Sequence, residues 1–390
     1  MAAKQSKVSD VYFSDLKVRG GDSLLNKFDR LITAAGIDKI DFEDKYVAVK
    51  IHFGEWGNMA FLRHQYAKVL CDHIKARGGK PFLTDCNTLY PGYRNNALGH
   101  LDVAMLNGYT PASTGVQNII ADGLRGTDER IIRVEGGKYV KKAKIGAAVA
   151  EADILISLTH FKGHVSAGFG GALKNVGMGC GSKHGKMEMH SEGTPVINKD
   201  KCVGCGMCVK NCNNEGVKVV RKKAVIDPDK CVGCGHCFAY CPKGAIDPAW
   251  DIAKPVLSCK IAEYTKAAIN GKPAFHISFV TDVSPFCDCD SSNDLPIVPD
   301  VGMFASFDPV ALDEACADAV NRQPVMQGSF AWKRIAKYAD ANNLDAAKLA
   351  AAPDKDLFDL MQPTTDWTAG QDHAVKLGLG TRKYKLNTVG

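Results

Sequence analysis

The chain has 390 residues, which is enough for one large domain with a small one or for two domains. Hydrophobic residues make up 45% of it and charged residues 24%, as in ordinary water-soluble globular proteins, and no apolar run reaches the roughly 18 residues of a membrane helix. The net charge of +6 is modest and does not indicate a nucleic-acid partner. The N-terminus has no hydrophobic signal segment, and fifteen cysteines are typical of metal and thiol chemistry, so we expect a cytoplasmic protein of a reducing, anaerobic cell.

The flanking regions have the pattern of a layered α/β fold. Tyr46–Phe53 is an apolar run rich in β-formers, residues 61–79 have helical spacing and end on two glycines, and Pro81–Asp85 is a second such run. Ala152–Phe161 and Ala274–Val283 read as further buried strands. Strand, helix and strand in succession predict an α/β class, with a parallel or mixed sheet and flanking helices.

Two helices are predicted nearer the C-terminus. Asp308 is placed as an N-cap and Pro309 as the first residue of the helix that follows. Ala331–Ala341 has the composition of another helix.

A cysteine-rich stretch between these regions carries the strongest motif. It reads CVGCGMCVKNC from Cys202 and CVGCGHCFAYC from Cys231, with 18 residues between the two runs. This is the spacing of bacterial ferredoxins, in which three thiolates of one run and the last thiolate of the other hold one 4Fe-4S cluster. The spacing predicts two clusters, one on Cys202, Cys205, Cys208 and Cys241, the other on Cys231, Cys234, Cys237 and Cys212. Zinc is the alternative occupant of paired CxxC motifs, but two complete CxxCxxCxxxC runs favour iron–sulfur clusters.

The position of the stretch indicates an insertion. Neither flank looks like a complete sheet alone, so we expect a ferredoxin-like α+β insertion at 193–250 that interrupts one α/β domain made of 1–192 and 251–390. Three successive domains remain the alternative. The insertion has nine Lys or Arg against five Asp or Glu, which either balances the charge of the clusters or forms a basic rim for an acidic electron carrier such as ferredoxin.

Polar residues follow the predicted strands, where open parallel sheets bind ligands. The first strand ends near Lys50 and His52, the second at Asp85, and the third near His160. Lys162 and His164 continue the third strand, and we take both as catalytic candidates, with Lys50, His52 and His160 as substrate candidates.

The residues after His164 are rich in glycine and lysine. The stretch contains Lys174, Asn175 and Lys183, which are candidates for binding an anion, and His184, a further catalytic candidate. A flexible, solvated basic loop is the alternative interpretation. No P-loop pattern is present.

Cys287 and Cys289 form a CxC pair between acidic residues, which makes them a possible extra thiol site for redox chemistry or metal. Neighbouring carboxylates oppose a thiolate unless a lysine or a metal compensates, so loop residues without chemistry are the default. Cys86 and Cys180 lie in polar or glycine-rich loops, and the sequence does not decide whether they bind metal.

The flanks resemble the family filed as domain of unknown function 362, often described as iron–sulfur centre proteins. The matching residues are VAVKIHFG from Val47, DILISLTHFKGHVSAGFGGALKN from Asp153 and DVGMFASFDPVALDEA from Asp300. The resemblance implies an α/β core, frequent 4Fe-4S binding and no general reaction. It marks as family motif positions Lys162, His164, Lys174, Asn175 and Asp308.

Three functions fit these features. The first is an oxidoreductase, in which two 4Fe-4S clusters pass low-potential electrons from a ferredoxin-like carrier to a small anionic substrate; Lys162, Lys174 and Lys183 bind the anion and His164 or His184 supplies a proton. The second is a non-catalytic electron carrier with a docking platform. The third is a non-redox enzyme or metal-handling protein with structural clusters, a class to which a distant similarity with nickel-pincer lactate racemases also points. No dinucleotide fingerprint indicates a nicotinamide, a flavin stays open, and the sequence names neither the substrate nor the oligomeric state.

Overall fold

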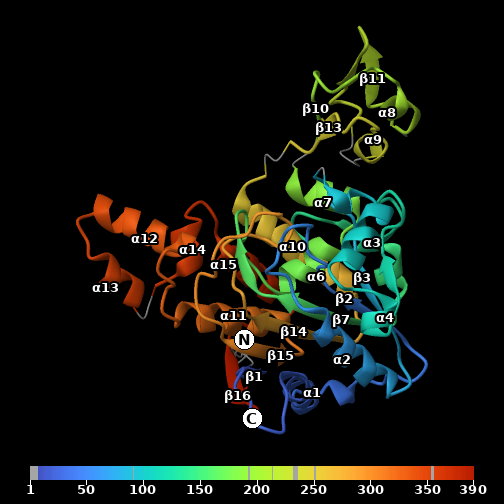
Figure 1. Ribbon diagram of the computed structural model, residues 1–390. Coiled ribbons are helices and arrows are strands. Elements are labelled where there is room, and N and C mark those ends of the chain that lie inside the picture. The colour runs from blue at the N-terminus through green and yellow to red at the C-terminus, as the bar shows by residue number, and fades with distance from the viewer. Residues whose placement is uncertain are drawn as a thin grey trace, which may run out of the picture.

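The computed structural model describes residues 8–90, 92–191, 194–212, 214–231, 236–249, 252–352 and 355–390. Its centre is an eight-stranded sheet (Figure 1). In spatial order the strands are β16 (Tyr384–Thr388), β1 (Ser9–Ser14), β15 (Gly302–Ser306), β14 (Ala274–Val280), β7 (Ile154–His160), β2 (Tyr46–Lys50), β3 (Lys80–Asp85) and β4 (Asn118–Ile120). The run from β14 to β4 is parallel, whereas β15 is antiparallel to both of its neighbours. The predicted α/β class with a parallel or mixed sheet is confirmed.

Helices cover both faces of this sheet because its strands are apolar on both sides. Val47 and Val49 of β2 pack in one core cluster with α1 (Leu24–Ala34) and α2 (His64–Lys75). Ala48, between them, points to the opposite face and packs with α6 (Ala172–Cys180) and α10 (Lys254–Ile269). The alternation of side chains along a strand therefore produces a three-layer arrangement.

The remaining elements complete the layers. They are α3 (Ala97–Leu106), α4 (Pro111–Thr114), β5 (Glu129–Arg133), β6 (Lys142–Gly146), α5 (Ala147–Glu151), β8 (Lys162–His164), β9 (Gly168–Gly170), α7 (Lys183–His190), α11 (Pro309–Asn321), α12 (Phe330–Ala341), α13 (Ala346–Ala351), α14 (Leu357–Met361) and α15 (Trp367–Lys376). Two single turns of 3₁₀ helix cover Ile37–Lys39 and Tyr93–Asn95. The predicted cap of α11 is present, since the Asp308 carboxylate accepts from the backbone N–H groups of Val310 and Ala311, both at 2.9 Å.

The glycine-rich stretch after His164 is helical, whereas a flexible loop was the alternative expected from its composition. It forms α6 and α7, and the glycines serve close packing. A Cβ atom on Gly177 would lie 2.1 Å from the backbone oxygen of Ile261, so only glycine lets α6 approach α10 this closely.

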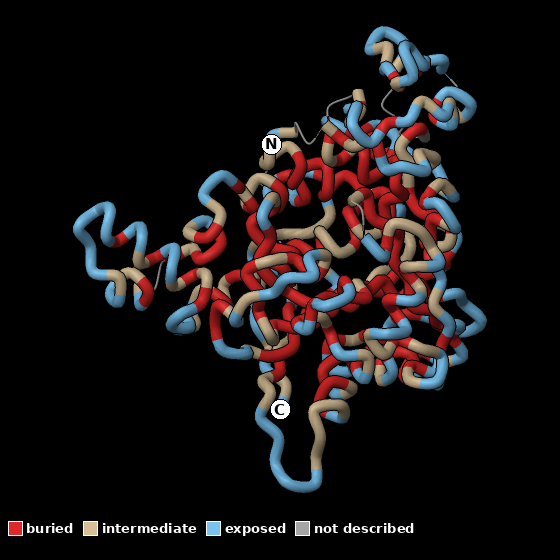
Figure 2. Tube along the Cα trace, turned by 45° about the horizontal axis from the view of Figure 1, so that its top comes forward, coloured by how far each residue is buried: buried red, intermediate tan, exposed pale blue. Residues whose placement is uncertain are grey.

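The cysteine-rich part extends from the main body at the top of Figure 1. It contains β10 (Val196–Ile197), α8 (Met207–Lys210), β11 (Val217–Val220), β12 (Lys223–Ile226), α9 (His236–Ala239) and β13 (Ile246–Asp247). β10 pairs with β13 and β11 with β12. Its chain is more exposed than the main body (Figure 2). The predicted boundaries at 192–193 and 250–251 lie outside the described residues, so the division of the chain stays a prediction.

In the ranges that the structure describes, no helix has both the length and the apolar character needed to cross a membrane.

Candidate functional site

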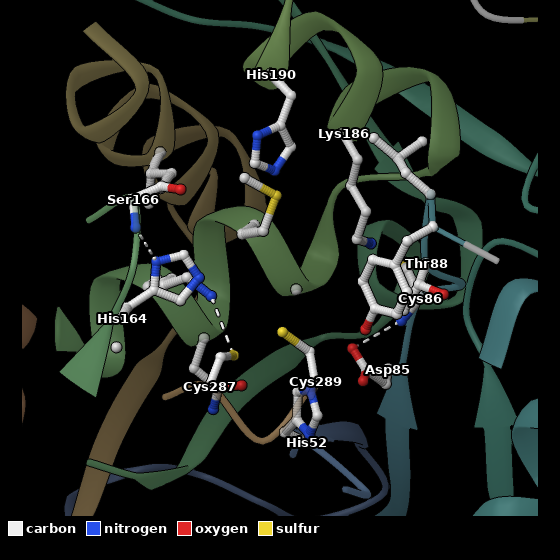
Figure 3. A pocket seen from close by; sticks show the side chains of 18 of the residues that line it. His52, Asp85, Cys86, Thr88, His164, Ser166, Lys186, His190, Cys287 and Cys289 are labelled. Atoms are coloured by element: carbon white, nitrogen blue, oxygen red, sulfur yellow. Dashed lines mark hydrogen bonds between the residues drawn. The ribbon is translucent and has the colours of Figure 1, made fainter. Parts of the chain in front are cut away.

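A cavity of about 260 Å³ lies beyond the carboxyl ends of β2, β3 and β7. Figure 3 shows its walls converging from separate elements, with His52 after β2, Asp85 and Cys86 on the β3 side, and His164 on β8. Lys186 and His190 reach it from α7, and a loop after β14 adds Cys287 and Cys289. The parallel strands therefore gather residues that are far apart in the sequence, as the strand-end rule predicts.

Cys287 and Cys289 are presented by a tight turn whose backbone is pinned. The N–H of Asp290 donates to the carbonyl of Cys287 at 2.9 Å, and the N–H of Glu55 donates to the carbonyl of Asp288 at 2.8 Å. Asn58 donates its side-chain amide to the carbonyl of Asp290 at 2.9 Å. These bonds hold the turn against the segment that follows β2.

The Asp288 side chain anchors the same turn from the side opposite the two cysteines. It is fully buried and lies 2.8 Å from His160 Nδ1 and 2.9 Å from Lys162 Nζ. Burial alone would raise the pKa of Asp288, but the charges of His160 and Lys162 outweigh it and hold the pKa well below its ordinary value. Its charge is thus compensated by a lysine, which removes the sequence-based objection to a thiolate at the neighbouring cysteine.

Cys287 is surrounded by donors. The Cys289 thiol donates a hydrogen bond to its sulfur and is the largest cause of a pKa lowered well below that of an ordinary thiol. Lys174 Nζ lies 3.7 Å from the same sulfur, and the neighbouring His164 imidazole lowers the pKa of Cys287 as well. The same bond raises the pKa of Cys289 well above its usual range. The pair is therefore one thiolate beside one thiol.

The ring of His164 has a defined tautomer. Its Nδ1 accepts the backbone N–H groups of Ser166 and Ala167, both at 3.1 Å, so the proton resides on Nε2, which faces Cys287. Burial lowers the pKa of His164 to about 4, and the ring is neutral near pH 7.

His164, Cys287 and Cys289 offer ligand atoms that lie within 4.8 Å of one another, close enough for one metal ion to contact all three. Two features of this arrangement compete with a metal. A ligating histidine usually donates from its second nitrogen, whereas Nδ1 here accepts, and the Lys174 ammonium already contacts the Cys287 sulfur.

Cations dominate the charged lining. Lys50, Arg94, Lys162, Lys174 and Lys186 line the cavity, with Asp85 as the carboxylate among its lining residues. Lys50 pairs with Asp85 at 3.0 Å, and the fully buried Arg94 pairs with Glu55 at 3.1 Å. Within the described chain, Lys174 and Lys186 form no salt bridge of their own, and Lys186 donates to the carbonyl of Gly181 at 2.5 Å. These two ammonium groups are available to an anion.

The predicted site residues divide into three groups. The cavity is lined by Lys50, His52, Lys162, His164, Lys174, Asn175, Cys287 and Cys289. His160 lies behind the wall, where its Nε2 contacts the carbonyl of Thr281 at 2.8 Å, so it positions Asp288. Lys183 and His184 do not line the cavity. Lys183 lies over the ring of Phe238 in the cysteine-rich part, and His184 contacts Glu129 at 3.1 Å.

Tyr90 and Arg94 line the cavity and were not considered from the sequence, whereas Lys186 and His190 also line it and belong to the glycine- and lysine-rich stretch without having been chosen as candidates. Lys186 and His190 are four residues apart on α7, a spacing that puts both on one face of a helix. An expected helix at Lys183–His190 would have separated them from His184 but not from Lys183, which is three residues before Lys186. Tyr90 and Arg94 follow β3, with Arg94 in the short 3₁₀ helix Tyr93–Asn95, and no sequence signal marked either residue.

Among the thiols outside the cavity wall, Cys71 and Cys316 are buried in helix–sheet cores, as packing residues are. Cys86 is buried at the cavity and donates to the carbonyl of Cys180 at 3.5 Å. Burial is the largest cause of the raised pKa of Cys86 and of Cys180, so these two thiols are unreactive.

In the cysteine-rich part, four cysteines line one small cavity: Cys202, Cys205, Cys208 and Cys241. The sulfurs of Cys202 and Cys241 accept backbone N–H groups of Ala224 and Ala245, at 3.2 and 3.3 Å. Of the second predicted set, Cys212 accepts from the N–H of Gly216 at 3.2 Å, Cys231 and Cys237 are described, and Cys234 lies outside the described residues.

A thin wall separates this part from the cavity. Leu89 and Tyr90 line the cavity and also a cleft of about 370 Å³ on their other side, where Phe238 and Cys241 lie. Arg125 over the ring of Tyr240 adds a second contact between the two parts.

Comparisons with known proteins give a family match and distant structural likenesses. The family model described as "Domain of unknown function (DUF362)" matches residues 47–318. The lactate racemase apoprotein from Thermoanaerobacterium thermosaccharolyticum has 11% identity and a TM-score of 0.37, covering 98% of this chain and 83% of that one. A Thermotoga maritima protein from a structural genomics consortium has 12% identity and a TM-score of 0.34, covering 66% of this chain and 50% of that one. No curated protein matches. Neither structural likeness is close enough to carry an argument.

Proposed function

Because the chain belongs to the DUF362 family, whose description names no reaction, we propose a function from the site itself: an iron–sulfur oxidoreductase that acts on a small anionic substrate held in the cavity. The observation that carries this proposal is the cavity lined by His164, Lys174 and Lys186. A purely electron-carrying protein needs a docking surface and no such cavity, so the cavity favours catalysis over the carrier function.

The cysteine-rich part supports iron–sulfur binding. Four thiols of the predicted first set line one small cavity, with Cys241 supplied by the second run as the ferredoxin pattern requires. Backbone N–H groups donate to the sulfurs of Cys202, Cys212 and Cys241, and such bonds tune cluster potentials in proteins. When bound, one 4Fe-4S cluster on each of the two predicted cysteine sets would supply one-electron transfer. An acidic carrier of the ferredoxin type is the partner that the basic insertion would accept.

The residues of the cavity then have distinct roles. Lys174 and Lys186 bind the anionic group, because the other lining cations Lys50, Lys162 and Arg94 are each paired with a carboxylate. The Nε2–H of His164 is a hydrogen-bond donor that faces the cavity and can orient the bound substrate, while the neutral ring keeps its proton. Lys183 and His184, expected from sequence to share these roles, take no part in them.

The test uses protein reconstituted anaerobically with iron and sulfide and then reduced with dithionite. After the excess dithionite is removed, small anionic oxidants are added and the visible absorbance of the clusters is followed. We expect at least one anion to reoxidise the wild type and a Lys348→Met control, which alters an exposed lysine on α13. Lys174→Met should slow this step about tenfold, the effect of roughly 1.4 kcal/mol of lost charge interaction. Clusters that do not cycle reversibly, or reoxidation that is indifferent to Lys174 for every anion tried, would overturn the proposal.

A further inference from the structure

We infer that Cys287 and Cys289 form a dithiol–disulfide couple and that the substrate class of the cavity is a small anionic disulfide. This deepens the proposed function and rests on it only for the source of electrons. The inference starts from geometry: two sulfurs within 4.8 Å, two residues apart on one turn, both at the cavity wall.

The turn suits the formation of a disulfide. The bond between the N–H of Asp290 and the carbonyl of Cys287 closes a four-residue turn and brings the backbones of Cys287 and Cys289 close together. A disulfide requires its sulfurs at about 2.05 Å and Cα atoms within about 7 Å, a range that residues two apart in such a turn satisfy. Asp288, held by His160 and Lys162, anchors the turn while the sulfurs change partners.

The two thiols have unequal surroundings, which assigns their roles. Cys287 faces the Lys174 ammonium at 3.7 Å and lies beside the His164 imidazole, so it is the attacking thiolate. Cys289 donates its proton to Cys287 and is the resolving thiol. Other nucleophilic chemistry of a cysteine needs no second thiol. The presence of the second thiol of Cys289 beside Cys287 therefore favours thiol–disulfide exchange.

The exchange is balanced in two steps. The Cys287 thiolate attacks one sulfur of the bound disulfide, a Cys287–substrate disulfide forms, and the other half of the substrate leaves as a thiolate. Cys289 gives its proton to that thiolate and attacks the Cys287 sulfur, which breaks the mixed disulfide and releases the second half as a thiolate. The protein then holds a Cys287–Cys289 disulfide, and its return to thiolate and thiol takes two electrons and one proton, with a donor of the iron–sulfur class as reductant.

The charge of the cavity selects the substrate. Lys174 and Lys186 face the space in front of the sulfurs, and a disulfide that carries carboxylates gains from both ammonium groups as its sulfur approaches Cys287. The same ammonium groups oppose a metal cation at these thiols.

The test measures thiol exchange directly on the reconstituted full-length protein. The probe is dithiobis(nitrobenzoate), a small disulfide with two carboxylates that releases coloured thionitrobenzoate. A Cys287→Ser/Cys289→Ser double variant gives the background from all other thiols. Above that background we expect two fast equivalents of released thiolate in the wild type and no retained probe. Cys289→Ser should release one equivalent and keep one nitrobenzoate on Cys287. Cys287→Ser should react at least about tenfold more slowly than the wild type.

Mass spectrometry supplies a second readout with an internal control. No Lys or Arg lies between Pro273 and Asn321, so trypsin leaves Cys287, Cys289 and Cys316 on one peptide. After exposure to the probe this peptide should lose two hydrogens, with Cys316 still open to alkylation once unfolded. Lys174→Met should slow release from dithiobis(nitrobenzoate) about tenfold and should slow the reaction with uncharged dithiodipyridine less, because the second reaction loses only the support of the Cys287 thiolate and not the contact with a substrate carboxylate.

Three results would overturn the inference: no exchange above the background, equal retention of probe in wild type and Cys289→Ser, or one metal ion per chain whose binding requires both cysteines and blocks exchange. The outcome is separable from that of the proposed function. If thiol exchange is intact but the clusters cannot be reduced and reoxidised, the proposed oxidoreductase function is wrong and the dithiol inference stands. If the clusters cycle but no exchange occurs, the dithiol inference is wrong and the proposed function stands.

Discussion

Removing the anchor of the cysteine turn should destabilise the protein strongly. Asp288→Asn keeps the size of the side chain but leaves the Lys162 ammonium, which is 6% exposed, without its counter-charge at 2.9 Å. Two unit charges at that distance attract by about 6 kcal/mol at an effective dielectric constant of about 20. Desolvation of the pair offsets part of this, and removal of one partner from a buried pair generally costs about 3–5 kcal/mol. We therefore expect Asp288→Asn to lower the free energy of unfolding by about 3–5 kcal/mol.

The assay is urea denaturation at pH 7, followed by fluorescence and by circular dichroism. Asp290→Asn is the matched control, because this carboxylate belongs to the same turn, is exposed and caps the N–H of Ser292; it should cost less than about 1 kcal/mol. Adding Lys162→Met to Asp288→Asn should restore part of the loss, with a coupling energy of about 1–3 kcal/mol. If Asp288→Asn costs no more than Asp290→Asn, or if the two substitutions are additive, the buried pair does not hold the turn.

Three further perturbations follow from other contacts. Cys241→Ala should remove about half of the iron and acid-labile sulfide of the reconstituted chain, because it deletes a ligand of one of two predicted clusters, while Cys316→Ala should leave both unchanged; equal iron content in the two variants would contradict the pairing. Gly163→Ala would put a Cβ atom 2.5 Å from the backbone oxygen of Pro285 and should cost about 1–3 kcal/mol in urea, whereas Gly170→Ala, whose Cβ meets a Lys162 side-chain carbon at 3.4 Å, should cost less. His276 is fully buried, and burial lowers its pKa to about 3, so it stabilises the fold above about pH 6.5 and loses that contribution as the pH falls toward its folded pKa. Between pH 7 and pH 5 the wild type should therefore lose about 2 kcal/mol more stability than His276→Gln, and parallel pH profiles in urea would speak against this assignment.

The sequence was informative wherever one local rule decided the structure. Residues Tyr46–Lys50 and Ile154–His160 are strands because their apolar side chains serve two faces, and Asp308 caps its helix through its own carboxylate. The strand-end rule pointed to Lys50, His52 and His164, which all line the cavity. The strands β1 and β16 were not predicted, because their pairing joins the two ends of the chain, a contact that local patterns do not contain.

Within the site, the misplaced residues share one cause. The stretch with Lys183 was interpreted from its glycine content as a loop, in which every lysine has the same access to a ligand. In the structure Lys186 lines the cavity, whereas Lys183, the first residue of α7, lies over the ring of Phe238, and His184 is turned away from the Lys186 face by the helix. The charge of Cys287 depends on Lys174, which is 113 positions away in the chain, and no spacing argument contains that contact.

The wall formed by Leu89 and Tyr90 has a kinetic consequence. Leu89 and Tyr90 line both the cavity and the cleft beside the cysteine-rich part, so we expect a protein that delivers electrons at that cleft and a small molecule in the cavity to bind at separate places. Neither has to depart before the other arrives. Steady-state rates should be measured while the concentrations of the electron-delivering protein and of the small substrate are both varied. An excess of either reactant should not competitively inhibit the other, as is typical of enzymes with two separate binding sites and unlike enzymes with one shared site.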